Sequence, residues 1–219
     1  GQLPGLFIAI DSMGVSARNA SNYPRALLLH RKGFELTEEI QRPKYMARCY
    51  NNFGVVYRRM DEYHKAIDYH YEALKISREL NDSHGMAVAL NSIGNIDYLL
   101  GRYESALNNF NKALSREKAN GTQLGIAINL NNIGNVYGAL NEYNTALDYY
   151  QRSLEVNKSA KNLKGIAICN DDIGSVYLEK GMHVEALKYF LKALDINENI
   201  GDKRNIAKSY LHLGEVFYQ

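Results

Sequence analysis

The chain has 219 residues, of which 46% are hydrophobic and 23% charged, and its formal net charge is +2. This composition is typical of a folded globular protein and argues against disorder. Acidic and basic residues are mixed along the chain, so no polybasic stripe points to nucleic acid. The longest apolar stretch is far shorter than the roughly twenty residues that cross a bilayer, so we expect no membrane insertion.

A repeat of forty residues organises the sequence. Glycine returns at this spacing at Gly14, Gly54, Gly94, Gly134, Gly174 and Gly214. Alanine follows the first five glycines after twelve residues, at Ala26, Ala66, Ala106, Ala146 and Ala186. Such periodicity is typical of solenoids. We predict one array of about five and a half units, with bounds at residues 1–41, 42–81, 82–121, 122–161, 162–201 and, for a partial unit, 202–219.

Within each unit, two helical patterns are separated by turn signals. Helix A carries the repeated glycine, and helix B carries the repeated alanine. Residues that tolerate the left-handed conformation follow helix A: Asp61, Gly101, Asn141 and Gly181. In the third unit we predict helix A from about Ser83 to Leu100 and helix B from about Tyr103 to Asn120. No stretch alternates as a strand does, so the predicted fold class is all-α.

The repeated glycine needs an explanation, because glycine inside a helix costs about 1 kcal/mol relative to alanine. A close helix crossing would recover this cost, since a side chain at the glycine would block it. We therefore predict that the glycine of helix A faces the small alanine of helix B. Large neighbours such as Leu130, Tyr137 and Tyr150 would then interlock around the crossing.

The reactive side chains form no catalytic pattern. Cys49 and Cys169 lie three whole periods apart, too far in a linear stack for a disulfide, so we predict two free thiols. The six histidines match no zinc spacing. His30 and His70 share a repeat position with later aromatic residues and are interpreted as packing substitutes. We expect no enzyme activity, no metal site and no cofactor.

One position breaks the pattern. Asp97 stands where four of the other units carry Tyr57, Tyr137, Tyr177 and Phe217. A carboxylate at an aromatic position is interpreted as a local packing difference rather than a functional site.

These residues resemble the tetratricopeptide repeat family. Its helix A pattern appears here as Leu130, Ile133-Gly134 and Tyr137, and its helix B pattern as Ala106, Phe110 and Ala113. The period of forty exceeds the family's common thirty-four, and is similar to that of kinesin light chains, spindle-orientation adaptors and many bacterial regulators. The resemblance implies a right-handed α-solenoid of antiparallel helix pairs, a superhelix in which helices A line a concave groove.

On a helical wheel, one side of helix A is semi-polar and repeats in register. It carries a ladder formed by Asn51, Asn91, Asn131 and Asp171, flanked by Asn95, Asn135 and Ser175. The adjacent positions Asn52 and Asn132 and the basic residues Arg48 and Arg58 complete the predicted groove. An amide can pair with both the N–H and the C=O of an extended peptide. The alternative is that these amides only bond adjacent helices.

Two functions follow from this groove. The first is a scaffold that binds an extended peptide or protein segment. The second is a sensor or regulatory module of a larger bacterial signalling protein, such as a histidine kinase or transcription regulator. The last unit has only helix A, which indicates a fragment with an uncovered face, so we predict a homodimer or end-to-end contact through Leu211, Val216 and Phe217. The expected location is cytoplasmic, or periplasmic within a membrane-bound sensor.

Overall fold

The computed structural model describes residues 2–218, and all of its regular elements are α-helices. The first six are α1 (Gln2–Asn19), α2 (Tyr23–Ile40), α3 (Pro43–Arg59), α4 (Tyr63–Glu79), α5 (Ser83–Leu99) and α6 (Tyr103–Asn120). The remaining five are α7 (Gln123–Ala139), α8 (Tyr143–Ser159), α9 (Leu163–Glu179), α10 (His183–Asn199) and α11 (Lys203–Tyr218). Odd-numbered helices are helices A and even-numbered ones helices B.

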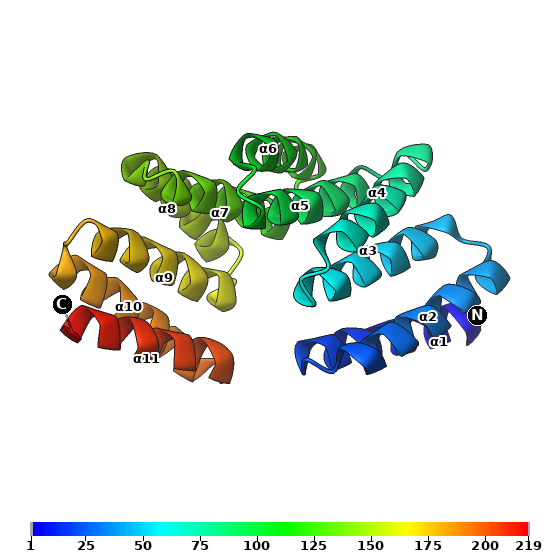
Figure 1. Cartoon of the computed structure of the whole chain (residues 1–219), viewed down its shortest axis with the longest axis horizontal. Helices are drawn as coiled ribbons and strands as arrows, with labels where there is room; N and C mark the ends of the chain where they lie inside the picture. The colour runs from blue at the N-terminus through cyan, green and yellow to red at the C-terminus, as the bar shows by residue number, and fades with distance from the viewer. Residues whose placement is uncertain (1, 219) are drawn as a thin grey trace. The chain divides into compact units, whose positions relative to one another are not determined.

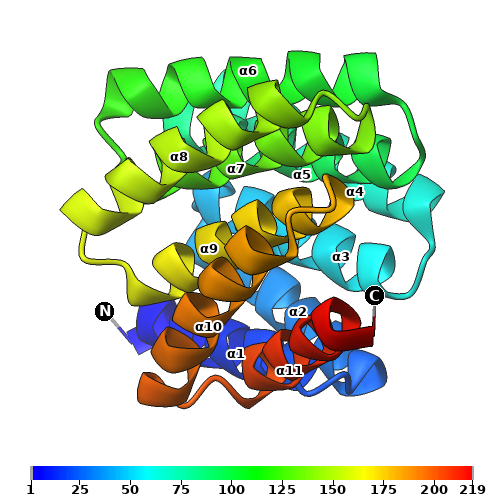
Figure 2. The same cartoon turned by 90° about the vertical axis from the view of Figure 1, so that its left-hand side faces the viewer.

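The chain divides into two compact units within α6, Gly1–Arg116 and Glu117–Gln219. In the second unit, α7 packs on α8, α9 on α10, and each helix A also contacts the next, α7 on α9 and α9 on α11. The first unit repeats this pattern with α1, α3 and α5 as helices A. Figures 1 and 2 show successive helices running antiparallel within each unit. The predicted fold class, an all-α solenoid of antiparallel helix pairs, is confirmed.

A left-handed residue ends each helix at an interval of twenty residues. Glycine takes this role at Gly101, Gly121, Gly181 and Gly201, with φ between 68° and 71°. Other residues take it at Ser21, Gln41, Asp61, Asn81, Asn141 and Lys161. The next helix often starts with a side-chain cap, as at Asp82 and Asn162, whose carboxylate and amide oxygens accept from the N–H groups of Gly85 and Gly165. The turn signals therefore act as predicted.

The repeated glycines lie at close helix crossings, but their partner differs from the prediction. A Cβ on Gly134 would stand 2.6 Å from Tyr150 Cε1, and one on Gly94 would stand 2.7 Å from Phe110 Cε1. His30, His70 and Phe190 cover Gly14, Gly54 and Gly174 in the same way. The alanines are fully buried, yet the group over each glycine is the ring sixteen residues later. The prediction that glycine faces alanine is wrong, because the ring of helix B needs the space that glycine leaves.

In addition to the glycine crossings, stacked aromatic pairs join helix A to helix B. Tyr137 stacks on Tyr149 with ring centroids 5.4 Å apart, and equivalent pairs join Tyr57 to Tyr69 and Tyr177 to Tyr189. In the third repeat both members change, to Asp97 and Asn109. The Asp97 carboxylate accepts from the Ser105 hydroxyl at 2.7 Å and from the Asn109 amide at 3.0 Å. A polar network around the buried Asp97 thus replaces the tyrosine stack.

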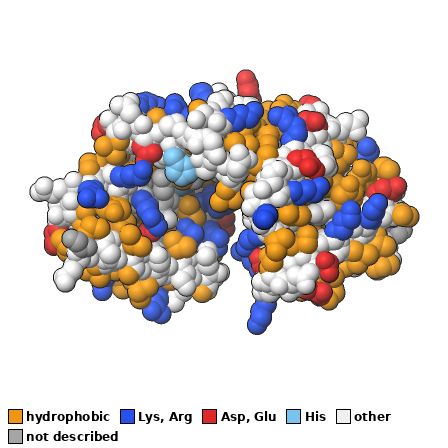
Figure 3. Space-filling model, turned by 180° about the vertical axis from the view of Figure 1, so that it is seen from behind, with side chains coloured by type: hydrophobic (Ala, Val, Ile, Leu, Met, Phe, Trp, Pro, Cys, Tyr) orange, Lys and Arg blue, Asp and Glu red, His pale blue; other side chains and the backbone are white. Residues whose placement is uncertain are grey.

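Among residues 2–218, no helix is both long and apolar enough to cross a bilayer. On the face seen in Figure 3, basic and acidic side chains are interspersed with apolar ones.

Val216 is only 9% exposed and packs with Phe190 and Leu194, so the prediction that it forms an exposed contact surface is wrong. Leu211 and Phe217 are 62% and 77% exposed.

Candidate functional site

The predicted groove residues of the first unit lie on α3 and α5, and most bond within the protein. Arg48 pairs with the buried Asp11 at 2.6 Å, and Asn52 donates to the other oxygen of Asp11 at 2.5 Å. Asn51 contacts His70 Nδ1 at 3.0 Å. Asn95 donates to Asn91 within α5. The Arg58 guanidinium is largely desolvated, and this burial, together with Arg59, lowers its pKa.

In the second unit the same positions lie on α7 and α9. Asn131 is 9% exposed and Asp171 5% exposed, whereas Asn132, Asn135 and Ser175 are half-buried. The Asn135 side-chain oxygen accepts from the Tyr150 hydroxyl at 2.7 Å. Ser175 donates to the Asp171 backbone carbonyl within α9. That these residues bind a peptide stays a prediction, since much of their hydrogen-bonding capacity is used internally.

A recurring contact links helix A to the next helix A at three places in the chain. Asn131 on α7 donates to Asp172 on α9 at 2.8 Å, over a separation of 41 residues. The same separation joins Asn52 to Asp11 and His212 to Asp171, the latter at 2.9 Å. The polar ladder therefore bonds neighbouring helices, which is the alternative considered for its amides.

The pKa values of two carboxylates in this network are shifted in opposite directions. Burial opposes ionisation of Asp171, but hydrogen bonds from His212 and Lys208 outweigh it and hold its pKa below the usual value. Burial raises the pKa of Asp172 to about 6, although Asn131 donates a hydrogen bond to it. No group of three or more histidine, cysteine or acidic side chains suited to a metal ion occurs in the part of the chain that the structure describes.

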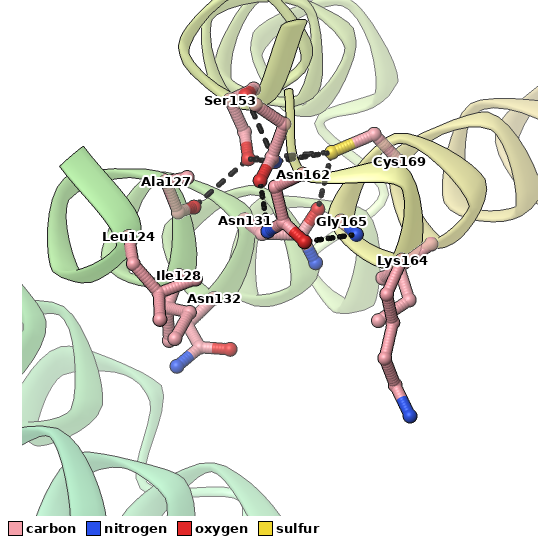
Figure 4. A pocket seen from close by; sticks show the side chains of 12 residues that line it. Leu124, Ala127, Ile128, Asn131, Asn132, Ser153, Asn162, Lys164, Gly165 and Cys169 are labelled. Carbon is pink, nitrogen blue, oxygen red and sulfur yellow. Dashed lines mark hydrogen bonds between the residues drawn. The ribbon is translucent and has the colours of Figure 1, made fainter. Parts of the chain in front are cut away.

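A groove of about 440 Å³ lies between α7 and α9 (Figure 4). Three aliphatic side chains form its exposed walls: Leu124, Ile128 and Ile168, which are 54%, 44% and 38% exposed. Its floor is polar and internally bonded. The Ser153 hydroxyl donates to the Ala127 carbonyl at 2.8 Å, and the Asn157 amide donates to the Ser153 carbonyl at 3.0 Å.

The two cysteines are free, as predicted, and both are buried. Cys169 contributes to the groove floor, where its thiol lies 3.4 Å from Asn131 Oδ1 and 3.3 Å from Ser153 Oγ. Burial raises the pKa of Cys169 to about 11 and that of Cys49 to about 12. Both thiols are therefore protonated at neutral pH and unsuited to nucleophilic attack.

The groove brings together Asn131 and Asn132 from the predicted site but adds residues that were not predicted. Leu124, Ser153, Asn157, Asn162 and Lys164 all line it. Figure 4 shows Asn132 and Lys164 pointing to the same side, away from the bonded floor. Asn157 and Asn162 come from the end of helix B and the following turn, and a wheel of helix A alone could not find them.

Comparisons with known proteins agree with this architecture. A tetratricopeptide repeat model matches residues 6–79, 45–119 and 85–159, and a second one matches residues 170–200. A comparison with curated protein sequences found no match.

Three solved structures illustrate the likeness. A Rap protein complexed with Competence and Sporulation Factor has a TM-score of 0.84 and 15% identity, with 93% of this chain and 57% of that chain covered. The Rap conjugation gene regulator of plasmid pLS20, in complex with the Phr* peptide, has a TM-score of 0.82 and 19% identity, covering 95% and 57%.

The third is a signal transduction ATPase with numerous domains and a tetratricopeptide repeat sensor, from Pyrococcus horikoshii. Its TM-score is 0.76 at 17% identity, with 93% of this chain and 31% of that chain covered. The chain thus spans little more than half of the two Rap chains and about a third of the sensor protein. Identities this low establish the fold alone. The sequence models cover most of the chain, which therefore belongs to the tetratricopeptide repeat family.

Proposed function

We propose that this protein is a non-enzymatic scaffold that binds an extended segment of another protein in the groove between α7 and α9. The observation that carries the proposal is the groove itself, whose walls are exposed aliphatic side chains and whose edge carries the amide of Asn132. Among residues 2–218 that amide has no hydrogen-bond partner, so it is available to a ligand. The groove's volume of about 440 Å³ lies in the range of ligand pockets.

The chemistry of such binding follows from these groups. The Asn132 amide can donate to a peptide carbonyl and accept from a peptide N–H. One side chain of the segment would be buried against Ile128 and Ile168, which stabilises the complex by about 1.5–3 kcal/mol. One structural neighbour was solved in complex with the Phr* peptide, and the other Rap protein was solved in complex with Competence and Sporulation Factor. Binding by this chain in the same general manner is consistent with the shared fold.

The test is selection from a random peptide display library, followed by fluorescence polarisation with the enriched peptides. We expect Ile168→Arg and Asn132→Ala each to weaken binding, the former by at least about tenfold. The matched control is Leu191→Arg, an aliphatic position on α10 that is 48% exposed and lies outside the groove. Peptides that bind the Ile168→Arg variant as tightly as the wild type would contradict this groove as the binding site.

A second candidate function is a regulatory module that acts through self-association. It is favoured by α11, where Leu211 and Phe217 are largely exposed. Our proposal is that these exposed apolar side chains contact a second copy of the chain.

A further inference from the structure

The groove between successive helices A occurs in an open and a closed form within the second unit. Between α9 and α11 it is about 30 Å³, against about 440 Å³ between α7 and α9. All six residues that line the small cavity have counterparts forty residues earlier that line the large one: Ala167, Ile168, Asp171, Asn197, Asn205 and Lys208. The two are therefore the same structural site in neighbouring repeats.

Of the six positions that line both cavities, three differ in residue type. Asp171 replaces Asn131, Lys208 replaces Ile168, and Asn205 replaces Gly165. The Lys208 ammonium lies 2.6 Å from the Asp171 carboxylate, so the lysine chain crosses the groove and fills it. Asn205 adds a side chain that bonds Asp202 at 3.0 Å. Between α9 and α11, the ion pair therefore lies in the space whose counterpart between α7 and α9 is vacant.

The same pairing recurs at the equivalent position of the first unit, where Arg48 on α3 lies 2.6 Å from Asp11 on α1. The acidic and the basic residue of each pair are 37 residues apart in the sequence. At the three equivalent positions between these two pairs, an asparagine is combined with an aliphatic residue: Asn51 with Val88, Asn91 with Ile128, and Asn131 with Ile168. The residues change together for a physical reason. A buried aspartate beside an aliphatic chain would be an uncompensated charge, which is strongly destabilising.

None of the described residues that line the open groove is a carboxylate that could pair with a positive charge. Asn131 is already committed, since its amide donates to Asp172 and its oxygen lies 3.4 Å from the Cys169 thiol. Of the charged side chains in the described residues, Lys164 alone lines the groove. A lysine or arginine entering there would lose hydration without gaining a carboxylate partner.

From this comparison we propose that the groove between α7 and α9 is a specificity pocket for one uncharged aliphatic side chain of the bound segment, and that the Asp171–Lys208 pair closes the next groove to such a side chain. The inference rests on the proposed peptide-binding function and adds the chemistry of the anchor. Aliphatic walls at Leu124, Ile128 and Ile168 favour it, and the neutral, internally bonded floor demands no charge.

The experiment installs the closing pair in the open groove. The double variant Asn131→Asp with Ile168→Lys copies Asp171 and Lys208, and its thermal melt verifies folding. Display-selected peptides should carry a leucine, isoleucine, valine or methionine anchor. Their affinity for the double variant should fall by at least about tenfold. Leu124→Glu, at a wall position that is 54% exposed and tolerant of charge, should weaken binding even if the double variant folds poorly. Leu191→Lys on α10 is the matched control and should bind as the wild type does.

The outcomes separate the inference from the function beneath it. Selected peptides that bind the folded double variant and Leu124→Glu unchanged, or that share a lysine or arginine anchor, overturn the specificity pocket and leave peptide binding standing. A library that yields no binder to the wild type overturns both. An aliphatic anchor whose affinity is lost in the groove variants and kept in Leu191→Lys supports the proposal.

Discussion

Gly134 and Gly138 lie one turn apart on α7 and meet different surroundings. A Cβ on Gly134 would stand 2.6 Å from a carbon of the buried Tyr150 ring, whereas one on Gly138 would meet only the Tyr150 hydroxyl, at 3.6 Å. We predict that Gly134→Ala lowers the free energy of unfolding by about 1–2 kcal/mol through overpacking, and that Gly134→Leu lowers it further. The measurement is urea denaturation.

Gly138→Ala is the control on the same helix. Its Cβ makes an ordinary contact, so alanine should gain helix propensity and raise the free energy of unfolding by up to about 1 kcal/mol. Equal effects of the two alanine variants would show that the ring over Gly134 can move aside, and the close-crossing explanation would then be wrong.

His70 occupies the ring position that Phe110 and Phe190 hold in other repeats. It is fully buried, and burial, together with Arg58, lowers its pKa to about 3. Because the pKa in the unfolded chain is near 6.5, protons bind the unfolded state more strongly at any pH between these values. The contribution of neutral His70 to the free energy of unfolding is therefore fully present above about pH 6.5 and is lost as the pH drops toward 3.

We predict that His70→Phe removes this acid sensitivity. Between about pH 7.5 and about pH 5, the wild type should lose about 2 kcal/mol of unfolding free energy through this group, and the variant should not lose that share. Urea midpoints at the two pH values give the difference. His30 also has a lowered pKa and acts in the same direction, so the comparison must be between variant and wild type. A variant with the same pH dependence as the wild type contradicts the assignment.

At the scale of the helix pair, α5 and α6 are joined by the Asp97 network in place of a tyrosine stack. Asp97 is 5% exposed and accepts from Ser105 and Asn109. We predict that Asp97→Ala costs about 1–3 kcal/mol, because the Ser105 hydroxyl and the half-buried Asn109 amide lose their carboxylate acceptor. The measurement is again urea denaturation.

The double variant Asp97→Tyr with Asn109→Tyr should recover much of this loss, since it restores the pair found in three other repeats. Asp97→Tyr alone should not. If the single tyrosine variant is as stable as the double variant, the two positions are independent and no exchange of one network for the other has taken place.

At the scale of the whole molecule, the exposed face of α11 predicts self-association. Leu211 and Phe217 project from this helix and are 62% and 77% exposed. We expect sedimentation velocity to show a mass that rises with protein concentration. Phe217→Glu should reduce this association, while Val184→Glu, at a position on α10 that is 78% exposed, should not. A strict monomer at high concentration argues against the regulatory alternative.

Much of the architecture could be predicted from the sequence, because the signals are local or periodic. Helix pairs follow from the spacing of apolar residues and from turn residues that tolerate a left-handed backbone, such as Gly101 and Asn141. The glycine period indicated close crossings, and the spacing of Cys49 and Cys169 indicated free thiols. These inferences need no knowledge of how helices are rotated against each other.

Only the tertiary structure decided which groups meet across helices. It placed the ring of Tyr150, not Ala146, over Gly134, and it bonded Asn131 to Asp172. It also distinguished an open groove at Ile168 from a closed one at Lys208. Helical periodicity fixes the face on which a residue lies, whereas the crossing angle and the direction of each side chain depend on the packing of both helices together.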